Sequence, residues 1–208
     1  MRIISGKLKG KKFEFFKTSS TRPIKDSVKE NIFNILIHSN QININIKESK
    51  VLDLYSGFGS FGLECISRFA NKVTFMEKDR KVVDVIKKNL KNLSIENKAR
   101  IIEGDINYSL KEFKKSKFNI FFIDPPYADN SYLANLEIIK NKRYFSKNHI
   151  VIIHREKKSK ENLHFLLDVL IIKKYGRSKI IFGKFNWVVF LCNFLPVPQL
   201  ADWKDLYC

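Results

Sequence analysis

Short apolar runs alternate with helical stretches along most of this chain, from Lys50 onward. The apolar runs predict strands at residues 51–54, 73–76, 100–102, 118–123 and 150–154, and the helical stretches begin near Ser60, Asp79, Asp105 and Ser131. Strands that alternate with helices are joined by right-handed crossovers, so this order predicts an α/β fold with a doubly wound, mostly parallel sheet. Two later β-like runs, 168–174 and 179–182, predict an antiparallel hairpin at the end of that sheet.

The length and composition allow one such domain with a small appendage. The chain has 208 residues, 44% of them hydrophobic, and a mean hydropathy of -0.23. It contains no apolar run near the roughly 20 residues of a membrane-spanning helix, and it starts without the apolar core of a signal peptide. Its three cysteines lack C-x-x-C spacing, which argues against a disulfide framework and a zinc site. We therefore expect a cytoplasmic protein with neither a membrane segment nor a bound metal.

The chain is strongly basic, with a formal net charge of +18 and a pI near 9.8. Such a charge attracts polyanions such as nucleic acids. Only eight of the 39 basic residues are Arg, and the chain is also rich in Ile, Asn and Phe, so an A/T-rich coding sequence is an alternative source of the charge. Within residues 1–30, however, nine basic side chains accompany only three acidic ones. That concentration favours a nucleic-acid-binding face near the start of the chain.

The first 25 residues read as a basic β-hairpin extension, with β-like runs at 2–5 and 13–16 placed around Gly6 and Gly10. A helix capped by Asp26 then opens the main domain, which we assign to residues 26–185. Residues 41–46 alternate Asn and Ile, and we interpret this low-complexity stretch as a surface loop. Residues 186–208 form a C-terminal tail, apolar at 187–194, whose role the sequence leaves open.

A glycine-rich loop at residues 53–62 follows the first predicted strand and opens a helix. Its three glycines suit a tight turn, close approach to a ligand and close helix–strand packing, although G-x-G-x-x-G alone is a weak signal. Glu77 ends the second strand, where an acid can hold ribose hydroxyls, and Asp105 follows the third, where it can accept from an adenine amine. Both a dinucleotide and S-adenosylmethionine fit this pattern. Asp53 would repel a pyrophosphate and attract the cationic methionine end of the methyl donor, so we favour the donor.

Asp124-Pro125-Pro126-Tyr127 follows the apolar run 118–123 and is expected at the same edge of the sheet as the glycine-rich loop. The prolines stiffen the backbone and remove two donors, which leaves carbonyl and carboxylate oxygens to accept hydrogen bonds. A rigid turn without chemistry is the alternative. The expected position of the motif beside the methyl group of the donor instead favours a binding site for a planar base with an exocyclic amine.

Together these residues resemble the class I methyltransferases that modify exocyclic amines. Residues 2–6, 9–11 and 21–34 are further similar to the RsmD family, which methylates guanine N2 at one site of bacterial 16S ribosomal RNA. The resemblance covers residues 1 to about 185. Phe58, Ile24 and Lys29 depart from it, since the family usually has a small polar residue, Thr and Arg at these positions.

The resemblance implies a Rossmann-like sheet, S-adenosylmethionine as the methyl donor, and 16S rRNA within a 30S subunit or its assembly intermediate as the partner of a monomeric enzyme. The implied catalytic residues are Asp124, Pro125, Pro126 and Tyr127. The implied donor-binding residues are Asp53, Tyr55, Ser56, Gly57, Gly59, Gly62, Glu77, Lys78, Asp105 and Ile106. The expected RNA contacts are Lys9, Lys11, Lys12, Arg22 and Lys29.

Two other functions remain open at this point. A DNA adenine-N6 or cytosine-N4 amino methyltransferase uses a similar D/N-P-P-Y/F motif, but 208 residues leave no room for a sizeable DNA-recognition domain. A non-catalytic RNA-binding module could keep the same fold. The intact acids at positions 53, 77 and 124 argue against a loss of catalysis.

Overall fold

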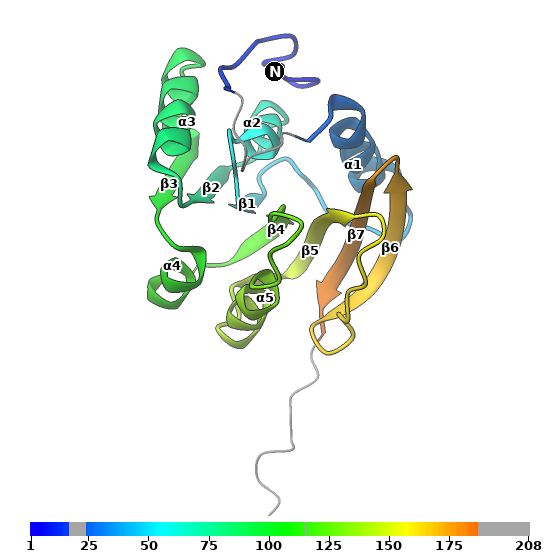
Figure 1. Ribbon diagram of the computed structural model, residues 1–208. Coiled ribbons are helices and arrows are strands. Elements are labelled where there is room, and N and C mark those ends of the chain that lie inside the picture. Colours follow the sequence, from blue (N-terminus) through cyan, green and yellow to red (C-terminus); the bar gives the residue numbers. More distant parts are fainter. Residues whose placement is uncertain (17–23, 115, 187–208) are drawn as a thin grey trace, which may run out of the picture.

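The computed structural model describes residues 1–16, 24–114 and 116–186, and shows a seven-stranded mixed sheet between two layers of helices (Figure 1). The strand order is β3-β2-β1-β4-β5-β7-β6. The strands are β1 (Lys50–Leu54), β2 (Lys72–Glu77), β3 (Ala99–Glu103), β4 (Phe118–Ile123), β5 (Phe145–Glu156), β6 (Leu167–Tyr175) and β7 (Ser178–Phe185). Strands β1 to β5 pair in parallel, and β7 pairs antiparallel with both β5 and β6. The predicted α/β sheet with a terminal hairpin is confirmed.

The helices of the main domain follow the predicted order. They are α1 (Asp26–His38), α2 (Ser60–Ser67), α3 (Arg80–Asn92), the short 3-10 helix η1 (Glu96–Lys98), α4 (Ile106–Glu112) and α5 (Tyr132–Asn141). Asp79 and Asp105 cap α3 and α4 with their side chains, as the strand-to-helix turns of such folds favour. Asp26 does not cap α1, because it is the first helical residue and Lys25 holds the cap position.

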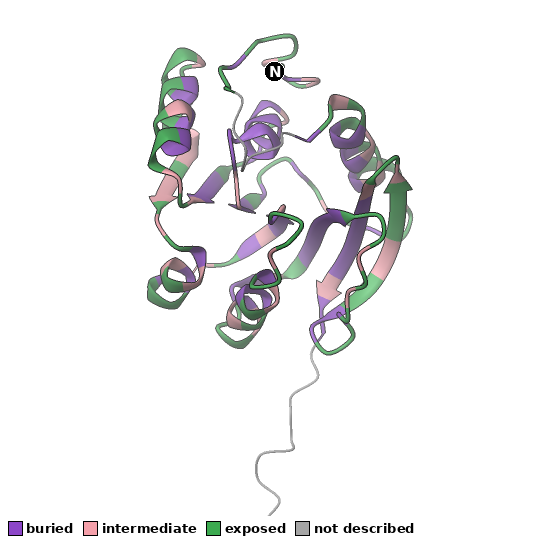
Figure 2. Cartoon of the chain, viewed as in Figure 1, coloured by how far each residue is buried: buried purple, intermediate pink, exposed green. Residues whose placement is uncertain are grey.

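Successive strand residues point to opposite faces of the sheet and therefore contact different helices. Val51, Phe75 and Phe122 belong to one hydrophobic cluster, with buried residues of α1, α2 and α3. Leu52 and Met76 belong to a second cluster, with buried residues of α4 and α5. Figure 2 shows the central strands buried between these layers; α2 is buried as well, while α1, α3, α4 and α5 keep exposed outer sides. Both faces of the sheet are thus covered, and the ends of the strands are left to form a site.

The fifth strand begins earlier than its apolar run predicts. Its first residue, Phe145, pairs with Phe118 of β4, and the register then shifts before Ile120 pairs with Ile150. The extension therefore depends on tertiary pairing rather than on local β-propensity. The alternating Asn and Ile of residues 41–46 form no strand, as predicted, although Ile42 and Ile46 are buried.

The N-terminal segment (residues 1–16) contains no regular strand, and the predicted β-hairpin is reduced to a short antiparallel pairing. Antiparallel pairing is limited to one isolated bridge between Arg2 and Lys12. Backbone hydrogen bonds flank it, including one from the Ile3 N–H to the Lys11 carbonyl at 2.9 Å. No strand forms at 2–5 or 13–16.

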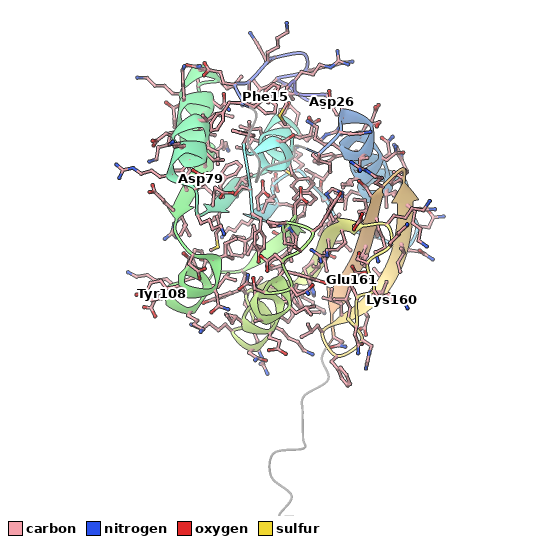
Figure 3. The ribbon with its side chains drawn as sticks, viewed as in Figure 1. Phe15, Asp26, Asp79, Tyr108, Lys160 and Glu161 are labelled. Atoms are coloured by element: carbon pink, nitrogen blue, oxygen red, sulfur yellow. The ribbon has the colours of Figure 1, made fainter. Side chains whose placement is uncertain are left out.

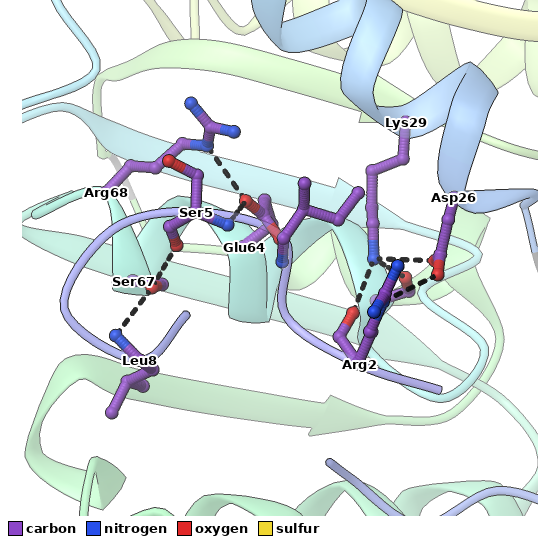
Figure 4. A network of polar contacts seen from close by, with 10 residues as sticks. Arg2, Ser5, Leu8, Asp26, Lys29, Glu64, Ser67 and Arg68 are labelled. Atoms are coloured by element: carbon purple, nitrogen blue, oxygen red, sulfur yellow. Dashed lines mark hydrogen bonds and ion pairs between the residues drawn. The ribbon is translucent and has the colours of Figure 1, made fainter. Parts of the chain in front are cut away.

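The backbone of the N-terminal segment instead bonds to α2, which explains the missing strand (Figure 4). The buried Glu64 carboxylate accepts the N–H groups of Ile4 and Ser5 at 2.8 and 2.9 Å. Gly6 has a φ of +83°, and a Cβ at this position would lie 2.0 Å from the Ser67 carbonyl oxygen. The segment is therefore docked on the domain by its own backbone.

No helix in the parts of the chain that the structure describes is long and apolar enough to cross a membrane. The C-terminal residues 187–208, including the apolar run at 187–194, lie outside the described residues.

Candidate active site

A cavity of about 530 Å³ lies at the carboxyl ends of β1, β2 and β4. Its volume is within the range of small-ligand sites. The chain order of the strands reverses between β1 and β4, which is where ligands of open α/β sheets bind. The predicted residues that line it are Tyr55, Ser56, Gly57, Glu77, Lys78, Ile106, Asp124, Pro125, Pro126 and Tyr127.

The glycine-rich loop is held in a close turn above β1 by a buried carboxylate. Asp53 is 1% exposed, and its Oδ2 accepts the Gly62 N–H at 3.0 Å. Burial raises the pKa of Asp53 well above its usual range, and the hydrogen bond from Gly62 opposes this shift. A Cβ on Gly62 would lie 2.3 Å from the Phe75 ring, so only glycine fits between helix and strand. The cavity lining does not include Asp53, Gly59 and Gly62. These residues instead support the loop on the side away from the cavity.

Two side chains at the start of the loop are fixed by hydrogen bonds. The Ser56 hydroxyl lies within hydrogen-bonding distance of the Asp53 and Met76 carbonyls, at 3.0 and 2.9 Å. Tyr55 has a φ of 56°, and its hydroxyl accepts from the Asn135 amide at 2.8 Å. Gly57 and Gly59 also have positive φ, at 52° and 78°. The loop therefore presents backbone to the cavity in a conformation that glycine adopts without strain.

Glu77 contributes a carboxylate to the side of the cavity that is predicted to hold the donor. Its Oε2 accepts the Gly57 N–H at 2.9 Å, and its Oε1 accepts the N–H groups of Lys78 and Asp79 at 2.9 and 3.0 Å. These bonds fix the carboxylate at the end of β2. Each carboxylate oxygen can accept two hydrogen bonds, so Oε2 retains capacity for a ribose hydroxyl. The site thus fits the ribose of S-adenosylmethionine.

Asp105 and Ile106 follow the third strand and are both predicted to bind the donor, but only one of them lines the cavity. Ile106 is buried and lines the cavity. Asp105 is exposed, is not among the lining residues, and accepts the Tyr108 N–H at 2.9 Å as the cap of α4. A role for Asp105 with an adenine amine stays a prediction.

The Asp124 carboxylate lies on the other side of the cavity and is oriented by a histidine. Its Oδ1 lies 2.8 Å from Nδ1 of His154, which extends from β5. The Asp124 N–H bonds to the Leu54 carbonyl at 3.4 Å, which ties the start of the motif to β1. No described residue donates to the Pro125 carbonyl, while Tyr127 is 38% exposed. An amine acceptor, a free carbonyl and an accessible ring therefore occur together.

Arg155 holds the remainder of the Asp124–Tyr127 motif from behind. Its guanidinium donates to the carbonyls of Pro126 and Tyr127 at 3.1 and 3.0 Å. The expectation that the carbonyls of this motif stay free is therefore wrong for these two residues. A planar, charged fork with several donors is suited to two adjacent carbonyls. Arg155 is 3% exposed, so it positions the motif without lining the cavity.

A buried acid balances the charge of Arg155. Glu161 lies in the loop between β5 and β6, next to the exposed Lys160 (Figure 3). Its Oε1 is 3.6 Å from the Arg155 Nε, and its Oε2 bonds to the Lys179 ammonium. The Arg155 guanidinium also lies 4.7 Å from the centre of the Tyr132 ring. The loop after β5 thus takes part in fixing the motif.

The predicted RNA contacts have different outcomes in the structure. Lys9, Lys11 and Lys12 are exposed in the N-terminal segment, and Arg22 lies outside the described residues. Lys29 is fully buried, and its ammonium donates to the Arg2 carbonyl and the Ser60 hydroxyl at 3.2 and 3.1 Å (Figure 4). A direct contact of Lys29 with RNA is therefore withdrawn. Burial lowers the pKa of Lys29. The hydrogen bond from its ammonium to the Arg2 carbonyl joins the N-terminal segment to the domain.

Sequence reasoning missed His154, Arg155 and Ser178. His154 ends a predicted strand and Arg155 follows it directly, so the rule that ligands gather at strand ends could have identified them. Ser178 begins the antiparallel β7, and only the pairing of β7 with β5 brings its hydroxyl within 2.9 Å of the His154 Nε2. Phe58, the departure in the glycine-rich loop, is 2% exposed and packs edge-on against Phe16 at a centroid distance of 5.0 Å.

Comparison with known proteins identifies the family. A family model described as Conserved hypothetical protein 95 matches residues 1–184. Ribosomal RNA small subunit methyltransferase D of Buchnera aphidicola subsp. Acyrthosiphon pisum is 36% identical over 156 residues, covering 75% of this chain and 78% of that protein. The protein of the same name from Escherichia coli K12 is 30% identical over 156 residues, covering 75% of each.

The fold comparison agrees with the family. The solved structure of the Escherichia coli protein yhhF has a TM-score of 0.76 and 25% identity to this chain, and the match covers 89% of this chain and 97% of that one. The sheet with its antiparallel end is that of class I methyltransferases, and the chain is an enzyme of that class. The chain thus belongs to the RsmD family of methyltransferases, which the matching family model describes as Conserved hypothetical protein 95.

Proposed function

We propose that this enzyme transfers a methyl group from S-adenosylmethionine to the exocyclic N2 amine of a guanine in 16S rRNA of the small ribosomal subunit. The names of the curated relatives support ribosomal RNA of the small subunit as substrate. The observation that carries the proposal is the pair of acceptors, the Asp124 carboxylate and the Pro125 carbonyl, at the wall of a cavity that also contains Gly57 and Glu77.

The donor would lie against the glycine-rich loop and Glu77. Gly57 allows close approach of the backbone, and Glu77 has acceptor capacity for the ribose hydroxyls. When bound, S-adenosylmethionine supplies an electrophilic methyl group on a cationic sulfur. Lys78 and Ile106 complete this side of the cavity.

Guanine N2 needs help from the protein because its lone pair is delocalised into the ring. The Asp124 carboxylate and the Pro125 carbonyl accept its two N–H groups and aim the lone pair at the methyl carbon. As the N–C bond forms and the C–S bond breaks, the electron pair of the C–S bond stays on sulfur and positive charge develops on the nitrogen, which then releases one of its two protons to water. Asp124 stabilises that charge more strongly in the transition state than in the ground state, which makes it catalytic.

The target guanine must leave its stack to reach these acceptors. The exposed Tyr127 ring is placed to stack on the extruded base, an interaction that contributes about 1–3 kcal/mol in single-strand recognition. Lys25 and Arg177 line the same cavity and, with the exposed lysines of the N-terminal segment, supply positive charge for flanking phosphates. We propose the same role for Arg22 from the sequence alone.

The test offers radiolabelled donor to 30S subunits, naked 16S rRNA and DNA, each prepared without the modification. We expect transfer to the 30S subunit or its rRNA, and digestion of the product to release N2-methylguanosine. Asp124→Ala should abolish transfer while donor binding, measured by calorimetry, stays near the wild-type value. Transfer to DNA alone, methylation of a different atom, or a fully active Asp124→Ala variant would each refute the proposal.

A further inference from the structure

His154 forms a chain of contacts between Asp124 and the terminal hairpin. Its Nδ1 lies 2.8 Å from Asp124 Oδ1, and its Nε2 lies 2.9 Å from the Ser178 hydroxyl. The His154 side chain is 7% exposed and the Asp124 side chain 22% exposed. The first residue after β4, a residue of β5 and the first residue of β7 thus meet at one imidazole ring.

The partners of the ring assign its hydrogens. An ionised carboxylate only accepts, so the proton of a neutral imidazole is on Nδ1 and is donated to Asp124. Nε2 is then the acceptor, and the Ser178 hydroxyl donates to it. Oδ1 accepts from His154, whereas no described residue donates to Oδ2, so Oδ2 is the oxygen that we assign to the substrate amine.

The Tyr127 ring limits rotation of the imidazole. It lies edge-on to the His154 ring, with centroids 6.0 Å apart and an angle of 81° between the planes. The ring that we assign to base stacking and the carboxylate that we assign to amine binding therefore contact the same histidine. A displacement of His154 would disturb both at once.

We propose that His154 is a positioning residue for methyl transfer: it holds the Asp124 carboxylate in the rotamer that presents Oδ2 to the substrate amine, and Ser178 orients its ring. This inference rests on the proposed function. The alternative is that His154 only fills space near the end of β5. The positioning role requires the donor at Nδ1, whereas filling space requires neither ring nitrogen.

Two polar substitutions separate these roles. In His154→Asn the amide nitrogen occupies the place of Nδ1, which keeps the donor to Asp124 and removes the hydrogen bond with Ser178. In His154→Gln the amide nitrogen occupies the place of Nε2 and donates to the Ser178 hydroxyl, so a hydrogen bond remains there with its direction reversed, while the donor to Asp124 is removed. Both remain polar at the same site, and thermal unfolding provides the check that both are folded.

The measurements are kcat and KM for unmodified 30S subunits from multiple-turnover transfer, and donor binding by calorimetry. We expect His154→Gln to reduce kcat by about 100-fold, the effect typical of a misplaced reacting group, with donor binding unchanged. His154→Asn should remain within about tenfold of the wild type. Ser178→Ala should reduce kcat by about fivefold, the rate equivalent of one neutral hydrogen bond.

Equal rates for folded His154→Asn and His154→Gln would overturn the inference, whether both are active or both inactive. So would a defect in His154→Gln that appears only in donor binding. A wild-type enzyme inactive on every substrate would instead refute the proposed function, which keeps the two failures apart. Should His154→Gln fail to fold, a Ser178→Ala variant with the full wild-type kcat would overturn the role of the chain of contacts.

Discussion

Replacement of Arg155 by lysine tests whether the Asp124–Tyr127 motif depends on its buried support. Lysine keeps a positive charge beside Glu161, so the substitution leaves no unpaired buried acid. It removes the planar fork that donates to the Pro126 and Tyr127 carbonyls at 3.1 and 3.0 Å. A hydrogen bond from a charged donor contributes about 1.5–3 kcal/mol, and one ammonium cannot reproduce both.

The loss of one such bond predicts a thermal midpoint lower by about 3–12 °C for a chain of this size. Since the motif would also shift relative to the donor, we expect kcat to fall by about 100-fold. Calorimetric unfolding and multiple-turnover transfer measure the two effects. Arg143→Lys is the matched control, because Arg143 is exposed and its hydrogen bonds to described residues involve its main chain. A variant of Arg155 with the midpoint and kcat of the control would contradict the reasoning.

Three further predictions concern the loop and the N-terminal segment. Burial raises the pKa of Asp53 in the folded protein, so the fold loses stability as the pH rises through this raised pKa and the carboxylate ionises. Asp53→Asn should therefore raise the thermal unfolding midpoint at neutral pH and weaken donor binding. A lowered midpoint would contradict this reasoning. Gly62→Ala should reduce donor affinity in calorimetry and lower the midpoint, because the Cβ would lie 2.3 Å from the Phe75 ring; an unchanged variant would show that the packing is looser than described. RNA binding should weaken when the exposed residues Lys9, Lys11 and Lys12 are all replaced by alanine. The slope of log K against log salt concentration should fall by about 0.7 for each phosphate that is no longer neutralised. An unchanged slope in a filter-binding titration would rule out their role.

Local features of the sequence were sufficient for the architecture and for most of the cavity. Apolar runs with helical stretches between them predicted the parallel strands, because a strand covered on both faces must be apolar throughout. The glycines, Glu77 and the Asp124–Tyr127 motif each follow such a run. Since the ends of parallel strands share one edge of the sheet, their meeting could be predicted without knowing any contact.

The remaining features depend on contacts between residues far apart in the chain. Lys29 has the side chain of a surface residue, and only the docking of the N-terminal segment on α2 buries it. The strand expected at residues 2–5 does not form because Glu64, some 60 residues away, accepts the N–H groups of Ile4 and Ser5. Tertiary structure alone brings Ser178 to His154 and Arg155 to the carbonyls behind Asp124, since both contacts depend on strand register. Periodicity and strand ends thus determined which chemistry the chain can offer, whereas packing decided which side chains hold that chemistry in place, because burial and register are properties of the whole fold.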